Sequence, residues 1–400
     1  MKALKRALAL GLCLALLAGS ALAAELVNLG SEGNDCLYYK CSLPDGRFIL
    51  AGSHAEPGYY NERGKARLLC MNPDGTVSWE YIDPEGTAGM FYSTVVTDDG
   101  RICTVFEDAP YQDTQAMSLK FFSLDGQPEG KPVPLDFSFW SEYWLTSKGL
   151  LTESYNYRTN RCEYTEFIAW NGRTLFHVRG GVPIALGPDD GVIAEDDGLV
   201  LYGREPASAG SAAKIMKVDY DGNTVWENVL SLETDLGRAE LSSGRKTQDG
   251  GYSAWMYECS GDNYRYATVR FSRDGRVISR KEIFFDDDGN REKNTDIERM
   301  TECRGMYVDE VITGDISSPE YVFHYTWYDA EGNELGTTEV QIRKEDFPQF
   351  ANGRDVHSFG GALIAAGDNL WKALGIWDET GDFEKTQASH EEYMFRVPMP

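Results

Sequence analysis

The sequence predicts an all-β protein, a seven-bladed β-propeller of four-stranded antiparallel blades, from two hairpin signatures that alternate along the chain. In the first signature, a short apolar run ends in an Asp-Gly-like turn and a second run follows at once. Its copies turn at Asp74-Gly75, Asp125-Gly126, Asn171-Gly172, Asp221-Gly222, Asp274-Gly275, 329–332 and 378–381. These turns recur about every 51 residues, a period typical of propeller blades.

The second signature is a glycine turn that precedes each copy of the first by about 20 to 30 residues, so that it falls within the same repeat. Its copies lie at Asp45-Gly46, Asp99-Gly100, Lys148-Gly149, Asp197-Gly198, Asp249-Gly250, Arg304-Gly305 and Gly360-Gly361. Asp-Gly and Gly-Gly tolerate the positive φ angles of tight hairpins, so each copy marks a reversal between antiparallel strands. One blade therefore reads strand a, glycine turn, strand b, longer loop, strand c, Asp-Gly turn, strand d. The expected blades are 35–83, 88–135, 139–178, 182–231, 239–285, 298–342 and 354–388. A pair of β-sandwiches is the alternative, but sandwiches lack a fixed period of this length.

Both ends of the propeller region read as short strands, at 25–29 and 393–397. Pairing one of them into the blade at the other end would remove an exposed sheet edge. Which of the two supplies the outer strand is left open by the sequence.

The N-terminal segment 1–23 is expected to be a secretory signal peptide, followed by a single domain, 24–400. Lys2, Lys5 and Arg6 precede an apolar run at 7–18, and small residues stand at the expected cleavage positions. The run is too short for a membrane span. Cys13 lies inside the run rather than after small residues, which disfavours a lipid anchor. We expect a secreted, extracellular or cell-envelope protein.

The charge of the chain restricts its partners. Its formal net charge is −26, and about −29 once the basic leader is removed, which disfavours nucleic acid and anionic lipid. Hydrophobic residues make up 42% of the chain, an ordinary proportion for a folded protein. We expect a monomer with an extracellular glycan or protein as its partner.

The cysteines and acidic loops give no strong sign of a cofactor or metal. Seven cysteines remain besides Cys13, an odd number, and most lie in predicted strands; a Cys36–Cys41 disulfide stays possible. No Cys/His spacing suits zinc. The stretches 286–290 and 219–223 resemble calcium loops but lack the glycine and the final acid of such loops, so an exposed acidic loop is favoured over calcium at 286–290. We therefore expect no metal and no cofactor.

Two patterns resemble the repeats of secreted bacterial β-propellers in the broad group that includes the pyrroloquinoline-quinone-like repeats. They are Asp249-Gly250-Gly251-Tyr252 with Phe271-x-x-Asp274-Gly275, and Val218-x-x-Asp221-Gly222-Asn223-x-x-Trp226. The resemblance implies a propeller over nearly the whole mature chain, with Trp79 and Trp226 packed between neighbouring blades. Quinoprotein enzymes of the group have vicinal cysteines, and this sequence has none, so the resemblance implies the fold without the dehydrogenase activity.

The predicted topology places the short glycine turns on one face and the longer b–c and d–a connections on the other. Binding sites are expected where variable loops cluster on a rigid scaffold. Aromatic, amide and arginine side chains are frequent in these connections and suit the recognition of sugars or proteins. The expected ligand-binding residues are Tyr59, Tyr60, Tyr111, Trp140, Tyr157, Arg158 and Tyr264. The alternative is that these side chains cover blade edges and hold the loops in place.

The sequence offers little support for catalysis. His357 is the weak candidate, because it alone among the histidines is predicted on the innermost strand of a blade, but spacing assigns it no partner. Nucleophile-elbow, phosphate-binding and zinc-protease motifs are absent from the sequence. We therefore expect an exported binding or scaffold module. The alternatives are a channel-centred polysaccharide hydrolase or lyase that uses His357, and a structural cell-surface protein.

Overall fold

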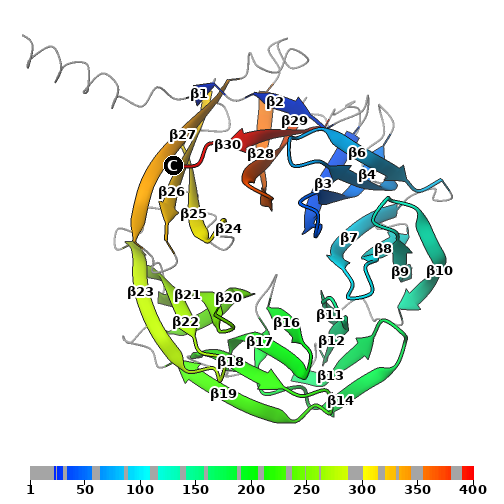
Figure 1. The fold of residues 1–400 in the computed structure, drawn as a ribbon, viewed down its shortest axis with the longest axis vertical. Coiled ribbons are helices and arrows are strands. Elements are labelled where there is room, and N and C mark those ends of the chain that lie inside the picture. The colour runs from blue at the N-terminus through cyan, green and yellow to red at the C-terminus, as the bar shows by residue number, and fades with distance from the viewer. Residues whose placement is uncertain are drawn as a thin grey trace, which may run out of the picture.

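The computed structural model shows an all-β propeller, in which sheets of four or five strands follow one another around a ring (Figure 1). The structure describes residues 22–23, 25–29, 34–55, 64–84, 89–108, 116–135, 141–156, 161–186, 191–205, 211–230, 237–247, 249–260, 263–286, 301–313, 320–329, 333–343, 355–379 and 390–400. Within these ranges, no helix is long and apolar enough to cross a membrane.

The first three sheets along the chain are four-stranded and consist of consecutive strands. They contain β3 (Asn34–Ser42), β4 (Phe48–Ala55), β5 (Lys65–Met71) and β6 (Val77–Ile82); β7 (Gly89–Val96), β8 (Ile102–Asp108), β9 (Ala116–Phe122) and β10 (Pro128–Leu135); and β11 (Ser141–Leu145), β12 (Gly149–Asn156), β13 (Arg161–Ala169) and β14 (Thr174–Arg179). The next two contain β15 (Ala185–Leu186), β16 (Val192–Glu195), β17 (Gly198–Arg204), β18 (Ala213–Val218) and β19 (Thr224–Leu230); and β20 (Arg238–Lys246), β21 (Tyr252–Ser260), β22 (Asn263–Phe271) and β23 (Val277–Asp286).

The remaining two sheets each include a strand from the N-terminal region. They contain β24 (Thr301–Cys303), β25 (Met306–Thr313), β26 (Glu320–Tyr328) and β27 (Glu334–Arg343) with β1 (Leu22–Ala23); and β28 (Asp355–Ala366), β29 (Asn369–Glu379) and β30 (His390–Val397) with β2 (Leu26–Asn28). β1 pairs parallel with β27, whereas β2 pairs antiparallel with β30 and supplies the outer strand that the sequence left open.

The predicted glycine turns are confirmed in the sheets from β3 to β27, apart from the turn at 329–332, most of which lies outside the described residues. Gly46 and Gly75 both have a φ of +87°, a conformation that only glycine adopts without strain. The aspartate ahead of the glycine fixes the turn through its side chain: Asp45 Oδ1 accepts the Arg47 backbone N–H at 3.1 Å. Each such turn joins adjacent antiparallel strands, which is why the two signatures recur with one period.

The sheet of β28–β30 corrects the expectation for the last repeat. Gly360-Gly361 was expected to form a hairpin turn, but β28 runs through it, with a register shift between Gly360 and Leu363. The hairpin turn lies instead at Gly367, which has a φ of +57°. A glycine pair serves equally well in a β-bulge and in a turn, so local sequence does not separate the two. Of the turn expected at 378–381, Asp378 and Glu379 lie in β29 instead, and Thr380 and Gly381 lie outside the described residues.

Aromatic side chains join neighbouring sheets, as the sequence predicts for Trp79 and Trp226. Trp79 in β6 donates its Nε1–H to the carbonyl of Leu124, at the β9–β10 turn of the next sheet, at 3.0 Å. Trp226 in β19 lies against Gly275 of the β22–β23 turn. Trp371 in β29 donates to the carbonyl of Pro73 at 3.2 Å and so links the last sheet to the first. Buried clusters extend the same contacts: one combines side chains of β17–β19 with side chains of β20–β22.

The described cysteines, from Cys36 to Cys303, are thiols. The Cys36–Cys41 disulfide left open by the sequence is not formed, because both residues lie in β3. Five residues of extended strand separate them by about 16 Å, far beyond the reach of a disulfide. Cys70 and Cys103 are fully buried, and burial raises the pKa of the Cys70 thiol to about 11.

We therefore expect dithiothreitol to leave the thermal unfolding midpoint unchanged, because no structural disulfide would be reduced. Scanning calorimetry with and without the reductant tests this. A fall of the midpoint by several degrees would show a disulfide that the fold requires.

Candidate functional site

The structure describes little of the surface that the sequence predicts as the ligand site. Tyr59, Tyr60, Tyr111, Trp140, Tyr157 and Arg158 all lie outside the described residues. Tyr264 was expected in a b–c loop, but it lies in β22, paired in register with Cys259 and with Asp286. Because Ser260 already pairs with Asn263, the connection between β21 and β22 is short. Tyr264 and Tyr266 alternate along the chain, and this pattern fits a strand as well as an aromatic loop. For this reason the sequence pattern did not show that Tyr264 lies in a strand.

The structure describes only the backbone of His357, the weak catalytic candidate. His357 lies in β28, the terminal strand of its sheet at the end opposite to β2, and it pairs in register with Trp377 of β29. Trp377 also pairs with His390, the first residue of β30. Among the described residues, no group of three or more His, Cys, Asp or Glu side chains could hold a metal ion.

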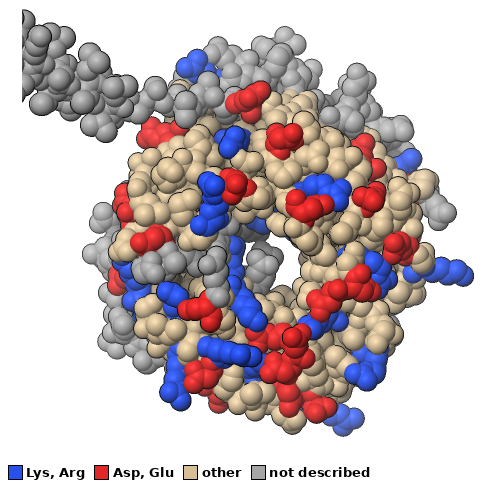
Figure 2. Space-filling model, in the orientation of Figure 1, with Lys and Arg blue, Asp and Glu red and all other residues tan. Residues whose placement is uncertain are grey.

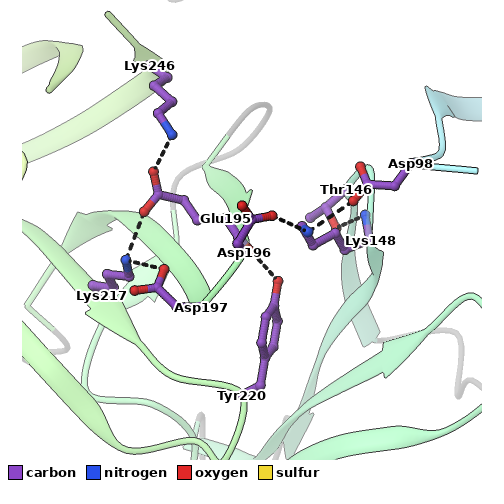
Figure 3. Close-up of polar contacts among 9 residues, drawn as sticks. All are labelled: Asp98, Thr146, Lys148, Glu195, Asp196, Asp197, Lys217, Tyr220 and Lys246. Atoms are coloured by element: carbon purple, nitrogen blue, oxygen red, sulfur yellow. Dashed lines mark hydrogen bonds and ion pairs between the residues drawn. The ribbon is translucent and has the colours of Figure 1, made fainter. Parts of the chain in front are cut away.

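The face with the short a–b turns, here called the turn face, carries a chain of ion pairs that crosses four sheets (Figure 3). Lys148, in the β11–β12 turn, contacts Asp98 of the preceding sheet at 3.0 Å and Asp196 of the following sheet at 2.8 Å. These two carboxylates raise the pKa of Lys148. Figure 2 shows acidic side chains gathered beside the central opening, next to β16.

Glu195, at the end of β16, is the centre of the second half of this network. Its carboxylate accepts Lys217 Nζ at 2.8 Å and Lys246 Nζ at 2.8 Å, and Lys217 also contacts Asp197 at 2.6 Å. Burial opposes the ionisation of Glu195, but the hydrogen bonds from the two lysines outweigh it and lower its pKa to about 2. Since Lys217 and Glu195 are each 5% exposed and already paired, this network stabilises the contact between sheets rather than offering a binding site.

The opposite face, here called the loop face, carries a different charged cluster. Arg204 ends β17, Arg238 and Glu240 lie near the start of β20, and Tyr257 lies near the end of β21. These strand ends lead into or out of the b–c and d–a connections. Arg238 and Glu240 are two residues apart on one strand and therefore point to the same side of the sheet. We call these four residues the Arg204–Arg238 cluster.

Three donors of the Arg204–Arg238 cluster meet at one carboxylate oxygen. Glu240 Oε2 accepts the Tyr257 hydroxyl at 3.0 Å and a short hydrogen bond from Arg238 Nη2, and it lies 3.4 Å from Arg204 Nε. The Glu240 residue is 2% exposed. Burial, and then the charge of Glu240, raise the pKa of the Tyr257 hydroxyl, so it stays protonated and remains a donor.

The two guanidinium groups are only partly used by these contacts. The Arg204 side chain is 30% exposed and the Arg238 side chain 44%, and Arg238 Nε is buried without a hydrogen-bond partner. Arg204 approaches Glu240 through its Nε atom, at 3.4 Å. The cluster can therefore bind an anion with its remaining N–H groups.

Sequence reasoning missed the Arg204–Arg238 cluster. A weak signal was present, since Glu240 interrupts an apolar pattern between Ala239 and Leu241, both fully buried. A carboxylate at such a position requires a buried cationic or hydroxyl partner. The sequence alone did not show which strand ends supply those partners.

The fold makes the chain a β-propeller protein. No known family profile matches it, and no curated protein matches it. Similar solved structures include a prolyl endopeptidase (14% identity, TM-score 0.49, covering 89% of this chain and 47% of that one). Another is Sqt1 from Chaetomium thermophilum (10% identity, TM-score 0.43, covering 95% of this chain and 100% of that one). A third is a protein of unknown function from Dyadobacter fermentans (8% identity, TM-score 0.41, covering 95% of this chain and 99% of that one).

The chain spans about half the length of the prolyl endopeptidase that it matches. At these identities the likeness concerns the fold alone. The arrangement of the sheets around a ring confirms the resemblance to the pyrroloquinoline-quinone-like group as far as the β-propeller fold, without assignment to a family.

Proposed function

We propose that the chain is an exported binding module whose ligand, a glycan or a protein, sits on the loop face. The observation that carries the proposal is the Arg204–Arg238 cluster. Its two guanidinium groups are held by a buried carboxylate, and their side chains remain 30% and 44% exposed. On the turn face, by contrast, the buried lysine Lys217 is fully engaged with carboxylates. Such a difference between two faces of a rigid ring supports recognition on the loop face.

The aromatic residues of the connections are proposed as further contacts for this ligand: Tyr59, Tyr60, Tyr111, Trp140 and Tyr157, with Arg158 beside them. They belong to b–c and d–a connections of other sheets, which by the topology join strands on the same face as the cluster. Flat aromatic rings give contact area at low entropic cost, which suits a ligand held weakly by few charges.

Thermal unfolding of residues 24–400 against a panel of neutral and acidic glycans and peptidoglycan fragments tests the proposal. A ligand that binds only the folded state raises the unfolding midpoint, by mass action. We expect a shift with at least one glycan class, lost when Tyr157 and Trp140 are replaced by Ala. A pull-down from the culture medium follows if no glycan shifts the midpoint. The binding module fails if neither experiment finds a ligand, and turnover of a glycan would favour the hydrolase or lyase with His357.

We also propose that the ring has seven blades, one for each sheet, with β2 as the outer strand of the last. The contact of Trp371 with Pro73, which links the sheet of β28–β30 to that of β3–β6, supports this closure. An experimental structure tests the number directly. A sheet that lies outside the ring would overturn it.

A further inference from the structure

We propose that Arg204 and Arg238 bind the carboxylate of an acidic sugar. The inference rests on the proposed function, because it assigns a ligand class to the loop face. It goes further in naming the two residues that select for a negatively charged group.

The first step is the donor capacity that the two arginines retain. A guanidinium carries five N–H groups in a planar fork that matches a carboxylate. Arg204 approaches Glu240 through Nε, at 3.4 Å, and the side chain is 30% exposed. Arg238 directs Nη2 toward the same oxygen. The Arg238 side chain is 44% exposed although its Nε is buried, so an incoming carboxylate can approach the exposed parts of the two guanidinium groups.

The second step is the rigidity of the site. Glu240 is buried and anchored by the Tyr257 hydroxyl at 3.0 Å, so it fixes the position of both guanidinium groups before any ligand arrives. A preformed pair of cations loses little side-chain entropy on binding. The ring of Tyr257 lies 5.8 Å from the Arg238 guanidinium and adds an aromatic surface beside the charge.

The third step concerns the size of the ligand. The chain has a net charge of −26, so its overall field opposes the approach of a polyanion or a strongly acidic protein. A single carboxylate on a small and otherwise neutral ring avoids most of this repulsion. An acidic monosaccharide, or an acidic residue at the end of a glycan, meets both conditions.

The experiment is a calorimetric titration of residues 24–400 with D-glucuronate. D-glucose is the neutral control, and acetate is a carboxylate without a sugar ring. We expect glucuronate to bind at least about tenfold more tightly than glucose, since one charge-assisted hydrogen bond contributes about 1.5 to 3 kcal/mol. Weaker binding of acetate than of glucuronate would show that the sugar ring contributes.

Three variants make the result specific. Arg204→Gln should weaken glucuronate binding at least about tenfold, the effect of losing one charged contact. Glu240→Gln should strengthen it, because glutamine keeps an amide oxygen that can hold the two arginines but removes the negative charge that competes with the ligand. Arg276→Gln is the matched control: this arginine is 84% exposed in the β22–β23 turn on the turn face, and its loss should change nothing. Opposite effects of the first two variants cannot arise from partial unfolding.

The inference is overturned if glucuronate and glucose bind equally, if glucuronate does not bind at all, or if Arg204→Gln binds glucuronate like the wild type. In each case, a neutral glycan or a protein still captured on the loop face would leave the binding module standing. Absence of every ligand would remove both.

Discussion

Replacing Gly275 by Ala is expected to destabilise the propeller by about 4 kcal/mol, the sum of a strained backbone and an overpacked contact. Gly275 has a φ of +76°, in the left-handed region that alanine adopts at a cost. A Cβ at this position would lie 2.3 Å from Cζ3 of Trp226 in the preceding sheet. The indole would have to move out of the contact between two sheets. Urea denaturation of the variant and the wild type measures the loss.

Gly172→Ala is the matched control for this prediction. Gly172 occupies the corresponding turn between β13 and β14 with a φ of +79°, but nothing lies within 4 Å of an added Cβ. The control therefore carries the backbone strain alone, about 1 to 2 kcal/mol. The difference between the two variants reports the docking of Trp226. Equal losses at both glycines would mean that Trp226 does not hold the two sheets together.

The contact between Trp226 and Gly275 also shows why so much of the fold could be predicted from the sequence. The turn glycine and the tryptophan four residues after the Asp-Gly pair are local features, and the repeat brings them together in successive sheets. The last repeat could not be predicted in this way. There the N-terminal strand β2 pairs with β30, a contact between residues at opposite ends of the chain. No local signal distinguishes that pairing from the alternative in which the C-terminal strand is outermost.

The candidate site could not be predicted for a related reason. Arg204 and Glu240 belong to different sheets, and each reads in the sequence as an ordinary charged residue near a loop. Their meeting depends on how closely the ends of β17 and β20 approach, which is set by packing around Tyr202 and Leu241. The same holds for Glu195, whose two lysine partners come from β18 and β20. Sequence periodicity predicts the strands, whereas ion pairs between sheets follow from the three-dimensional packing.

The Glu195 network leads to a pH-dependent prediction. The folded-state pKa of Glu195, about 2, lies below the value of about 4.5 expected for the unfolded chain. A depressed carboxyl pKa stabilises the protein fully above the unfolded value, and this contribution is lost as the pH falls toward the folded value. We therefore expect the free energy of unfolding to decline from about pH 5 to pH 2, with Glu195 contributing about 3 kcal/mol of that decline.

Glu195→Gln tests this contribution. At pH 7 the variant should be less stable than the wild type by about 3 kcal/mol, because glutamine keeps the shape of the side chain but not its charge opposite Lys217 and Lys246. The two stability curves should converge as the pH approaches 2, where the wild-type carboxylate is also protonated. Asp196→Asn is the adjacent control: Asp196 is fully exposed, so solvent screens its contact with Lys148 and the variant should follow the wild-type curve closely. A Glu195→Gln curve parallel to that of the wild type would mean that other carboxylates cause the acid sensitivity. Convergence of the two stability curves would instead show that the ion pairs of the turn face stabilise the contact between sheets. Ligand binding would then be left to the loop face.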